Sequence, residues 1–131
     1  MASPRKLAPS ETATVLLTED DPDVRELVSA FLRDLGYVVL AAADAQEALR
    51  LLDAHEEIAL LLTDVTLPGG TTGFTLARQA NGRRPGIKVI YASGHMRVGD
   101  WPGPDELLGP LLTKPFRLGD LQRRIESALQ H

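Results

Sequence analysis

The feature that most constrains the fold of this chain is a series of five short apolar runs separated by amphipathic stretches. The apolar residues within each run are consecutive rather than alternating, which is typical of strands covered on both faces of a parallel sheet. The stretches between the runs show helical periodicity. The pattern therefore predicts βαβ units in a doubly wound α/β sheet. The runs cover residues 14–18, 38–42, 58–63, 88–93 and 110–113.

Helix start and stop signals support this interpretation. Apolar residues recur at helical spacing over residues 24–35. Asp21 and Pro22 precede them as a cap and a first-turn proline, and Gly36 follows as a stop. Three further helices are expected: residues 44–55, which begin with a capping-box-like Asp44 and Glu47; residues 74–80, a short and weak pattern; and residues 118–129.

Length and composition bound the class of protein. A chain of 131 residues with 44% hydrophobic residues is expected to fold as one globular domain. The first residues are rich in Pro, Ser, Ala and charge, so we expect a flexible tail over residues 1–12 and one domain over residues 13–131. The absence of cysteine excludes a disulfide framework and a thiol nucleophile.

The sequence also argues against some partners. Its apolar runs are too short to cross a bilayer and residues 1–13 lack the apolar core of a signal peptide, so a cytoplasmic protein is the default expectation. A net charge of −4 and the lack of nucleic-acid-binding motifs give no basis for nucleic-acid contacts. We therefore expect neither membrane nor nucleic acid as a partner. The start at Met1 and the short tail favour a free-standing protein.

Polar and charged side chains follow four of the five expected strands. In an open α/β sheet, ligands bind beyond the carboxyl ends of the strands, so these side chains are expected to meet at one edge. Each alone is also compatible with an ordinary turn, helix cap or strand end, but their joint placement is not explained in that way. They are Glu19, Asp20 and Asp21 after the first strand, Asp64 after the third, Ser93 at the end of the fourth and Lys114 after the fifth.

Several carboxylates at one edge of a sheet would repel one another. Two unit charges about 4 Å apart cost roughly 4 kcal/mol at an effective dielectric constant of about 20. Such a cluster either raises its pKa values or binds a cation. Because the strand ends offer oxygen ligands and no His or Cys, the fitting ion is Mg²⁺, with Mn²⁺ as a substitute.

The stretches VLLTEDDPDVREL, LLLTDVTLPGG, VIYASGH and LLTKPF together resemble the receiver domain of two-component response regulators. The resemblance covers about residues 13–131 and implies a flavodoxin-like, five-stranded parallel sheet of order 2-1-3-4-5. The loop LPGGTTGF has one more residue than the commonest receiver loop and is similar to those of receivers attached to hybrid histidine kinases. The resemblance is to receivers of the single-domain type.

The resemblance implies a metal site. Glu19 and Asp20 match the acidic pair of the family, in which Asp20 would contact Mg²⁺ directly and Glu19 would act through water. Asp64 would be a further ligand, and Thr66 would lend its backbone carbonyl to the metal. Asp21 falls just after the acidic pair and is better interpreted as a helix cap.

The resemblance also implies a phosphoacceptor site. Asp64 matches the aspartate that is phosphorylated, Ser93 the hydroxyl residue that hydrogen-bonds the phosphoryl group, and Lys114 the lysine that forms an ion pair with it. The bond between Lys114 and Pro115 is typically cis in the family. The implied donor is a phosphohistidine on a histidine kinase or a histidine phosphotransfer protein. The product is an acyl phosphate that changes protein–protein contacts and that water later removes.

Two departures from the family concern its output face. Leu111 stands where many receivers carry Tyr or Phe on the fifth strand. Residues 95–104 contain Pro and Gly where the family usually has its fourth helix, so we expect a loop or frayed turn there, with at most a short helix near residues 105–108. His95 is either a site-edge residue or a solvated one, and Trp101 either anchors a partner or packs against the domain.

Other functions remain open at this point. A Mg²⁺-dependent phosphohydrolase with an Asp nucleophile usually carries a second acid two residues later, and here that residue is Thr66. A nucleotide or flavin binder needs a glycine-rich turn after the first strand, but the chain has TEDDPD there. A pseudo-receiver scaffold would not need the acids, the hydroxyl and the lysine that this chain retains.

Overall fold

The computed structural model describes residues 13–94 and 107–130 of the chain. Within them, five strands form one sheet of order β2-β1-β3-β4-β5, and every neighbouring pair is parallel. This confirms the predicted order. The third strand includes one more residue than predicted, Asp64, and the fifth begins one residue later. The strands are β1 (Thr14–Thr18), β2 (Val38–Ala42), β3 (Ile58–Asp64), β4 (Lys88–Ser93) and β5 (Leu111–Thr113).

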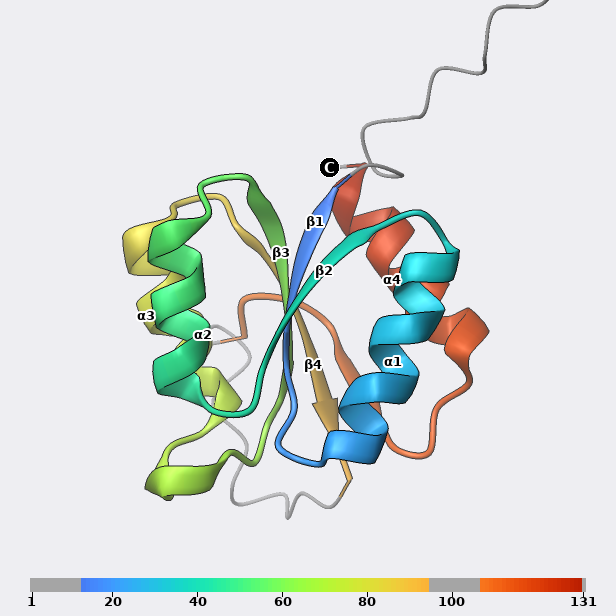
Figure 1. Ribbon diagram of the computed structural model, residues 1–131, viewed down its shortest axis with the longest axis horizontal. Helices are drawn as coiled ribbons and strands as arrows, with labels where there is room; N and C mark the ends of the chain where they lie inside the picture. The colour runs from blue at the N-terminus through green and yellow to red at the C-terminus, as the bar shows by residue number, and fades with distance from the viewer. Residues whose placement is uncertain (1–12, 95–106, 131) are drawn as a thin grey trace, which may run out of the picture.

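Helices cover both faces of the sheet, as the doubly wound prediction requires. Figure 1 shows α2 and α3 on one face and α1 and α4 on the other. A short 3₁₀ turn, η2, precedes α3. Among the described residues the helices are α1 (Pro22–Asp34), α2 (Ala45–Ala54), α3 (Gly73–Arg83) and α4 (Leu118–Leu129), with η2 at Pro68–Gly70.

The predicted caps of the first two helices are confirmed. The Asp21 side chain accepts hydrogen bonds from the N–H groups of Asp23 and Val24 at the start of α1. The Asp44 side chain accepts from the N–H of Glu47 in α2. These bonds satisfy backbone donors that have no partner within the first turn of a helix.

The third helix is longer than predicted at both ends. Thr72 caps its start by accepting a hydrogen bond from the N–H of Thr75. The helix then continues past Ala80, although Gly is a poor helix former and occurs at position 82. The next residue after the helix, Arg84, donates to backbone carbonyls of other elements, and this tertiary anchor outweighs the weak local preference.

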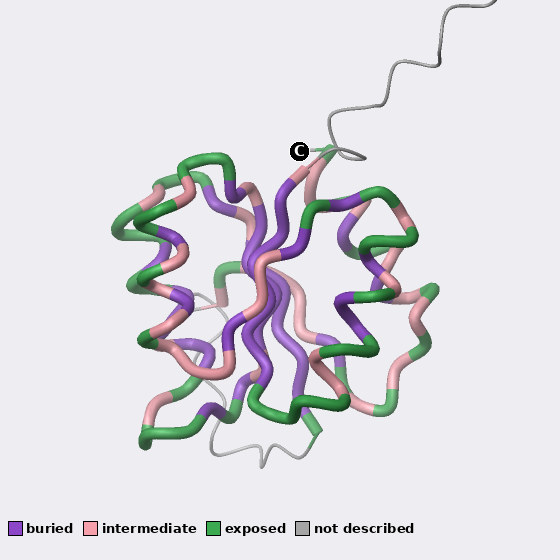
Figure 2. The backbone as a smooth tube through the Cα atoms, in the orientation of Figure 1, coloured by how far each residue is buried: buried purple, intermediate pink, exposed green. Residues whose placement is uncertain are grey.

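The core consists of two apolar layers, one on each face of the sheet, because successive side chains of a strand point to opposite faces. Leu16 of β1 packs in the layer under α2 and α3, whereas Val15 and Leu17 pack in the layer under α1 and α4. Figure 2 shows the central strands buried along their length. The consecutive apolar runs of the sequence are therefore explained by burial on both faces.

Some predictions concern residues outside the described part of the chain. They are the tail over residues 1–12 and the loop over residues 95–104, with His95 and Trp101 in it. Leu107 and Leu108, at the end of the expected short helix, are described and are not helical. Within residues 13–94 and 107–130, no helix has the length and apolar character needed to span a membrane.

Candidate functional site

Three acidic residues converge at the carboxyl ends of two neighbouring strands. Glu19 and Asp20 directly follow β1, and Asp64 is the last residue of β3. The two strands are paired up to Thr18 and Thr63, so their ends lie side by side. One carboxylate oxygen from each of the three acids lies within 4.8 Å of the others. The sheet order thus produces the cluster predicted from the strand ends.

Asp21 does not belong to this cluster. Its carboxylate caps α1, and its backbone N–H donates to Oε2 of Glu19 at 3.2 Å. The acidic run after β1 therefore divides into two ligand candidates and one helix cap, as predicted.

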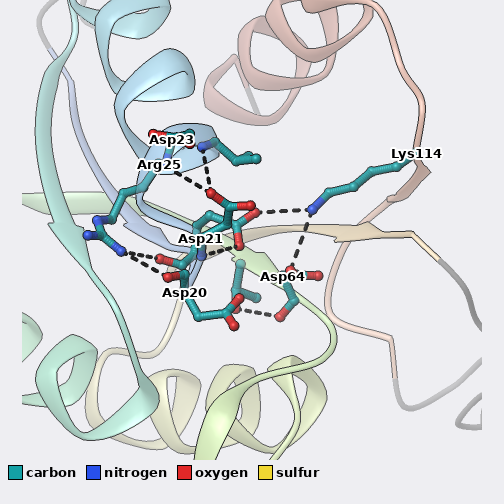
Figure 3. A network of polar contacts seen from close by, with 9 residues as sticks. Asp20, Asp21, Asp23, Arg25, Asp64 and Lys114 are labelled. Atoms are coloured by element: carbon teal, nitrogen blue, oxygen red, sulfur yellow. Dashed lines mark hydrogen bonds and ion pairs between the residues drawn. The ribbon is translucent and has the colours of Figure 1, made fainter.

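Lys114 lies between two of the acids (Figure 3). Its Nζ is 3.1 Å from Oε1 of Glu19 and 3.5 Å from Oδ2 of Asp64. Its backbone N–H donates to the carbonyl of Ser93 at 2.6 Å, which joins the ends of β4 and β5. The peptide bond between Lys114 and Pro115 is cis, as the resemblance implied.

Burial and excess negative charge shift the pKa values in this cluster. Burial raises the pKa of Glu19, and the charge of Asp64 adds to the effect, while hydrogen bonds from Asp21 and Lys114 oppose it. Burial lowers the pKa of Lys114, but the hydrogen bond to Glu19 and the charge of Asp64 outweigh burial and raise it above its ordinary value. One ammonium group thus pairs with two of three clustered carboxylates, so the cluster keeps excess negative charge, which favours a cation.

Asp64 is held closely by its neighbours. Its backbone carbonyl accepts a hydrogen bond from Oγ1 of Thr63 at 2.8 Å, and only 14% of its side chain is exposed. A Cβ atom on Gly73, at the start of α3, would overlap this carbonyl oxygen. The sequence interpretation missed Gly73, whose only signal was a glycine at the first turn of a helix, where other residues are better helix formers.

Ser93 ends β4 with its hydroxyl buried. The residue is 1% exposed, and within the described chain its Oγ has no hydrogen-bond partner. Ala92, the residue before it, is paired with Asp64 across the two strands. A buried hydroxyl without a partner costs roughly 1–3 kcal/mol, and a ligand that hydrogen-bonds this hydroxyl would offset the cost.

Thr66 lies in the loop that follows Asp64 and is exposed. The loop is closed by a bridge between Thr66 and Thr72 and by a 2.7 Å hydrogen bond from the N–H of Gly73 to the carbonyl of Val65. At its tip, Gly69 has a φ of 86°, in the left-handed region that favours glycine. The role of the Thr66 carbonyl as a metal ligand stays a prediction.

The donor set fits the metal that the sequence predicted. Carboxylate oxygens from three residues are the hard ligands that Mg²⁺ takes, usually with several waters retained. Neither His nor Cys lies in the cluster, which disfavours softer metals. Glu19, Asp20 and Asp64 are the described residues that could hold such an ion.

Comparisons with known proteins agree with this geometry. A model of the response regulator receiver domain matches residues 15–126. The chain is 35% identical over 116 residues to the response regulator receiver protein CpdR of Brucella abortus, covering 88% of this chain and 95% of CpdR. The crystal structure of the receiver domain from the hybrid histidine kinase CckA is 34% identical, with a TM-score of 0.76, and the match covers 90% of this chain and 100% of that one.

A further solved structure supports the fold. A response regulator receiver domain protein from Clostridium thermocellum aligns with a TM-score of 0.83 at 25% identity, over 90% of this chain and 94% of that chain. The sheet order and helix placement described above are thus shared with solved receiver domains.

Proposed function

The chain belongs to the response regulator receiver domain family, and on this premise we propose that Asp64 is the residue that accepts a phosphoryl group. Receiver domains act in two-component signalling as phosphoacceptors rather than as enzymes in the usual sense, and a histidine kinase is the implied phosphodonor. The observation that carries the assignment is the position of Asp64. It ends β3, lies within 4.8 Å of two other acids and has Lys114 at 3.5 Å.

The proposed transfer is an in-line displacement at phosphorus. A carboxylate oxygen of Asp64 forms a bond to the phosphorus of a phosphohistidine, and the bond from phosphorus to the histidine nitrogen breaks. The electron pair of that bond stays on the nitrogen, and the product is an acyl phosphate on Asp64. The end of β3 holds the carboxylate in a fixed direction, which favours this geometry. Water later cleaves the acyl phosphate.

Receiver domains use a divalent metal, and we propose Mg²⁺ here, with Mn²⁺ as a substitute. Glu19, Asp20 and Asp64 would hold it, together with the backbone carbonyl of Thr66. When bound, the ion offsets negative charge on the phosphoryl oxygens. In this structure the ammonium group of Lys114 pairs with two of the three carboxylates, those of Glu19 and Asp64.

Lys114 and Ser93 would link phosphorylation to a change of shape. The ammonium group that bridges Glu19 and Asp64 in this structure would pair with the phosphoryl oxygens once Asp64 is modified. The buried Ser93 hydroxyl, which has no partner in the described chain, would donate to the phosphoryl group. Because Ser93 ends β4 and Lys114 directly follows its neighbour β5, their movement would alter the surface beyond these strands and hence protein–protein contacts.

The wider setting is also a proposal. We assign residues 13–131 to the receiver domain and residues 1–12 to a tail, and we place the phosphorelay in the cytoplasm. The donor would be a histidine kinase or a histidine phosphotransfer protein. CpdR, which the chain covers almost end to end, and the CckA receiver, which belongs to a hybrid histidine kinase, both support a role in such a relay.

Intact mass spectrometry tests the assignment. The protein is incubated with MgCl₂ and acetyl phosphate, and the wild type is expected to gain one phosphoryl group, whereas a sample with EDTA gains none. Asp64→Asn should not gain this mass. Asp34→Asn, which alters an exposed acid at the end of α1, is the matched control and should behave as the wild type. Equal gain by Asp64→Asn would refute the assignment.

A further inference from the structure

The side chain of one residue of α1, Arg25, hydrogen-bonds two successive backbone carbonyls of the acidic turn after β1. Nη1 of its side chain lies 2.8 Å from the carbonyl oxygen of Glu19 and 3.4 Å from that of Asp20. Its own backbone N–H donates to the carbonyl oxygen of Asp21 at 2.9 Å. Figure 3 shows Arg25 and Lys114 reaching the acidic residues from opposite sides.

These bonds fix the direction of the Asp20 side chain. Peptide units are planar, and the two planes that flank the Cα atom of Asp20 carry the carbonyls of Glu19 and Asp20. Arg25 holds both carbonyls. With both planes held, the φ and ψ angles of Asp20 are set, and so is the direction of its Cα–Cβ bond.

Asp20 has no other support for its side chain. Asp20 is exposed, and among the described residues its carboxylate makes no hydrogen bond. The carboxylate of Glu19, in contrast, is buried and bonded to Lys114 and to the N–H of Asp21. Asp20 therefore depends on its backbone for its place in the cluster, and Arg25 holds that backbone together with the hydrogen bond from the N–H of Asp21 to Glu19.

We propose that Arg25 is a positioning residue for the divalent-metal site, which holds the turn over residues 19–21 so that the Asp20 carboxylate faces those of Glu19 and Asp64. This inference rests on the proposed function, since it requires that the acidic cluster binds Mg²⁺. Arg25 makes no ion pair with the cluster, so its contribution is to preorganise the ligands rather than to neutralise them. A guanidinium group is suited to this because it stays charged at every ordinary pH and several of its N–H groups can donate.

Isothermal titration with MgCl₂ tests the proposal on the wild type, Arg25→Ala, Arg25→Lys and Arg33→Ala. Removing a partner that orients a metal ligand typically weakens metal binding by about 10- to 100-fold, and we expect Arg25→Ala to fall in this range. Arg25→Lys should recover part of the loss, because an ammonium group can still donate to the carbonyl of Glu19. Arg33 is the matched control: it lies on the same helix and donates to a carbonyl remote from the cluster, that of Val39, at 3.5 Å.

A second measurement reports on the turn itself. Amide hydrogen exchange of the Asp21 N–H, without metal, should be faster in Arg25→Ala than in the wild type and unchanged in Arg33→Ala. This readout does not depend on metal binding. Circular dichroism establishes that each variant is folded, and Arg25→Lys serves as the test variant if the alanine variant is unfolded.

The outcomes separate the inference from the function on which it rests. If the wild type binds no Mg²⁺, both fail. If the wild type binds Mg²⁺ and the folded Arg25 variants bind it within about twofold of the wild type, as ordinary surface substitutions would, only the positioning role of Arg25 fails. An equal loss in Arg25→Ala and Arg33→Ala would also overturn it, since the effect would then be a general weakening of α1.

Discussion

Gly73 lies so close to Asp64 that a side chain on the glycine would overlap the backbone carbonyl oxygen of the aspartate. The start of α3 thus packs directly against the end of the strand that carries the proposed phosphoacceptor. The contact fixes where the loop over residues 65–72 leaves the site and where it returns. Only a residue without a Cβ atom permits it.

The first prediction follows from this contact. Gly73→Ala should lower the free energy of unfolding by about 1–3 kcal/mol, because overpacking displaces backbone rather than a flexible side chain. Gly82→Ala in the same helix is the control: a Cβ atom there meets nothing within 4 Å. It should stabilise the protein by about 0.5–1 kcal/mol through helix propensity. Urea denaturation measures both, and similar values for the two variants would contradict the packing argument.

The second prediction concerns Arg84, which joins α3 to the end of α2 and the start of β3. Its guanidinium group donates to the carbonyls of Leu52 at 2.7 Å and Ile58 at 3.1 Å, among others. Arg84→Ala should cost about 1.5–3 kcal/mol, the range for hydrogen bonds of a charged group. The neighbouring Arg83 forms an exposed ion pair with Asp53, and Arg83→Ala should cost no more than about 1 kcal/mol. Urea denaturation of the two variants measures both losses of stability. A loss in Arg84→Ala no larger than that in Arg83→Ala would contradict the prediction.

Periodicity in the sequence was enough to predict the sheet. The limits of β1, β2 and β4 agree with the prediction because these strands are continuous apolar runs ended by turn residues or polar residues. The acidic cluster was predictable too, since parallel strands of known order bring their carboxyl ends together. The predicted end of α3 was wrong because the helix is extended towards Arg84, and the contacts of Arg84 are made with residues distant in the sequence.

Two features of the site could not have been read from the sequence. The hydrogen bonds of Arg25 to the acidic turn depend on the path of the backbone after β1, and an arginine in the first turn of a helix gives no signal of them. The need for glycine at position 73 depends on how α3 meets β3. Both are properties of packing, whereas the residues that carry charge at the strand ends are visible in the pattern itself.

The third prediction is a pH dependence set by Tyr91. The ring is fully buried, its hydroxyl accepts a hydrogen bond from the N–H of Leu108 at 3.3 Å, and burial raises the pKa of Tyr91 above its usual 10.0. The folded state then keeps the phenol proton at pH values at which the unfolded state has lost it. The resulting stabilisation is fully present below pH 10 and is lost as pH rises through the folded pKa of Tyr91.

Two variants isolate this effect. Tyr91→Phe should lose stability less steeply above pH 10 than the wild type, although Lys114, whose pKa is also raised, still contributes a loss in the same direction. In Tyr37→Phe, Tyr91 is the single remaining tyrosine, so its ionisation can be followed by ultraviolet absorbance. An ordinary tyrosine titration in the folded protein would contradict the prediction.

The fourth prediction is that Mg²⁺ stabilises the protein through Asp20. At about 100 times its Kd, a ligand that binds only the folded state adds about 2.7 kcal/mol to the free energy of unfolding. The melting temperature of the wild type should therefore rise with Mg²⁺, and Asp20→Ala should lose most of this rise. Asp23→Ala, which removes an exposed acid of α1 outside the cluster, should keep it. A full rise in Asp20→Ala would mean that Mg²⁺ stabilises the protein without Asp20 and would contradict the prediction.

The last prediction separates phosphorylation from the response to it. Ser93→Ala removes a buried hydroxyl that has no partner in the described chain, so the stability of the resting protein should not fall. Lys114→Ala leaves Glu19 and Asp64 without their shared cation. Both variants should still accept some phosphate from acetyl phosphate, because Asp64 and the other two acids are intact, and intact mass spectrometry measures the extent.

The response of these variants should be weaker than their phosphorylation. In the wild type, beryllofluoride with Mg²⁺ should change amide hydrogen exchange over residues 107–113, since Lys114 directly follows β5 and its N–H is bonded to Ser93. Ser93→Ala and Lys114→Ala should show a smaller change at the same occupancy of Asp64, because neither can pull its strand end towards the phosphoryl mimic. Ser127→Ala, an exposed hydroxyl on α4, should respond as the wild type. An undiminished response in both site variants would remove Ser93 and Lys114 from the switch and leave them as residues of the resting site.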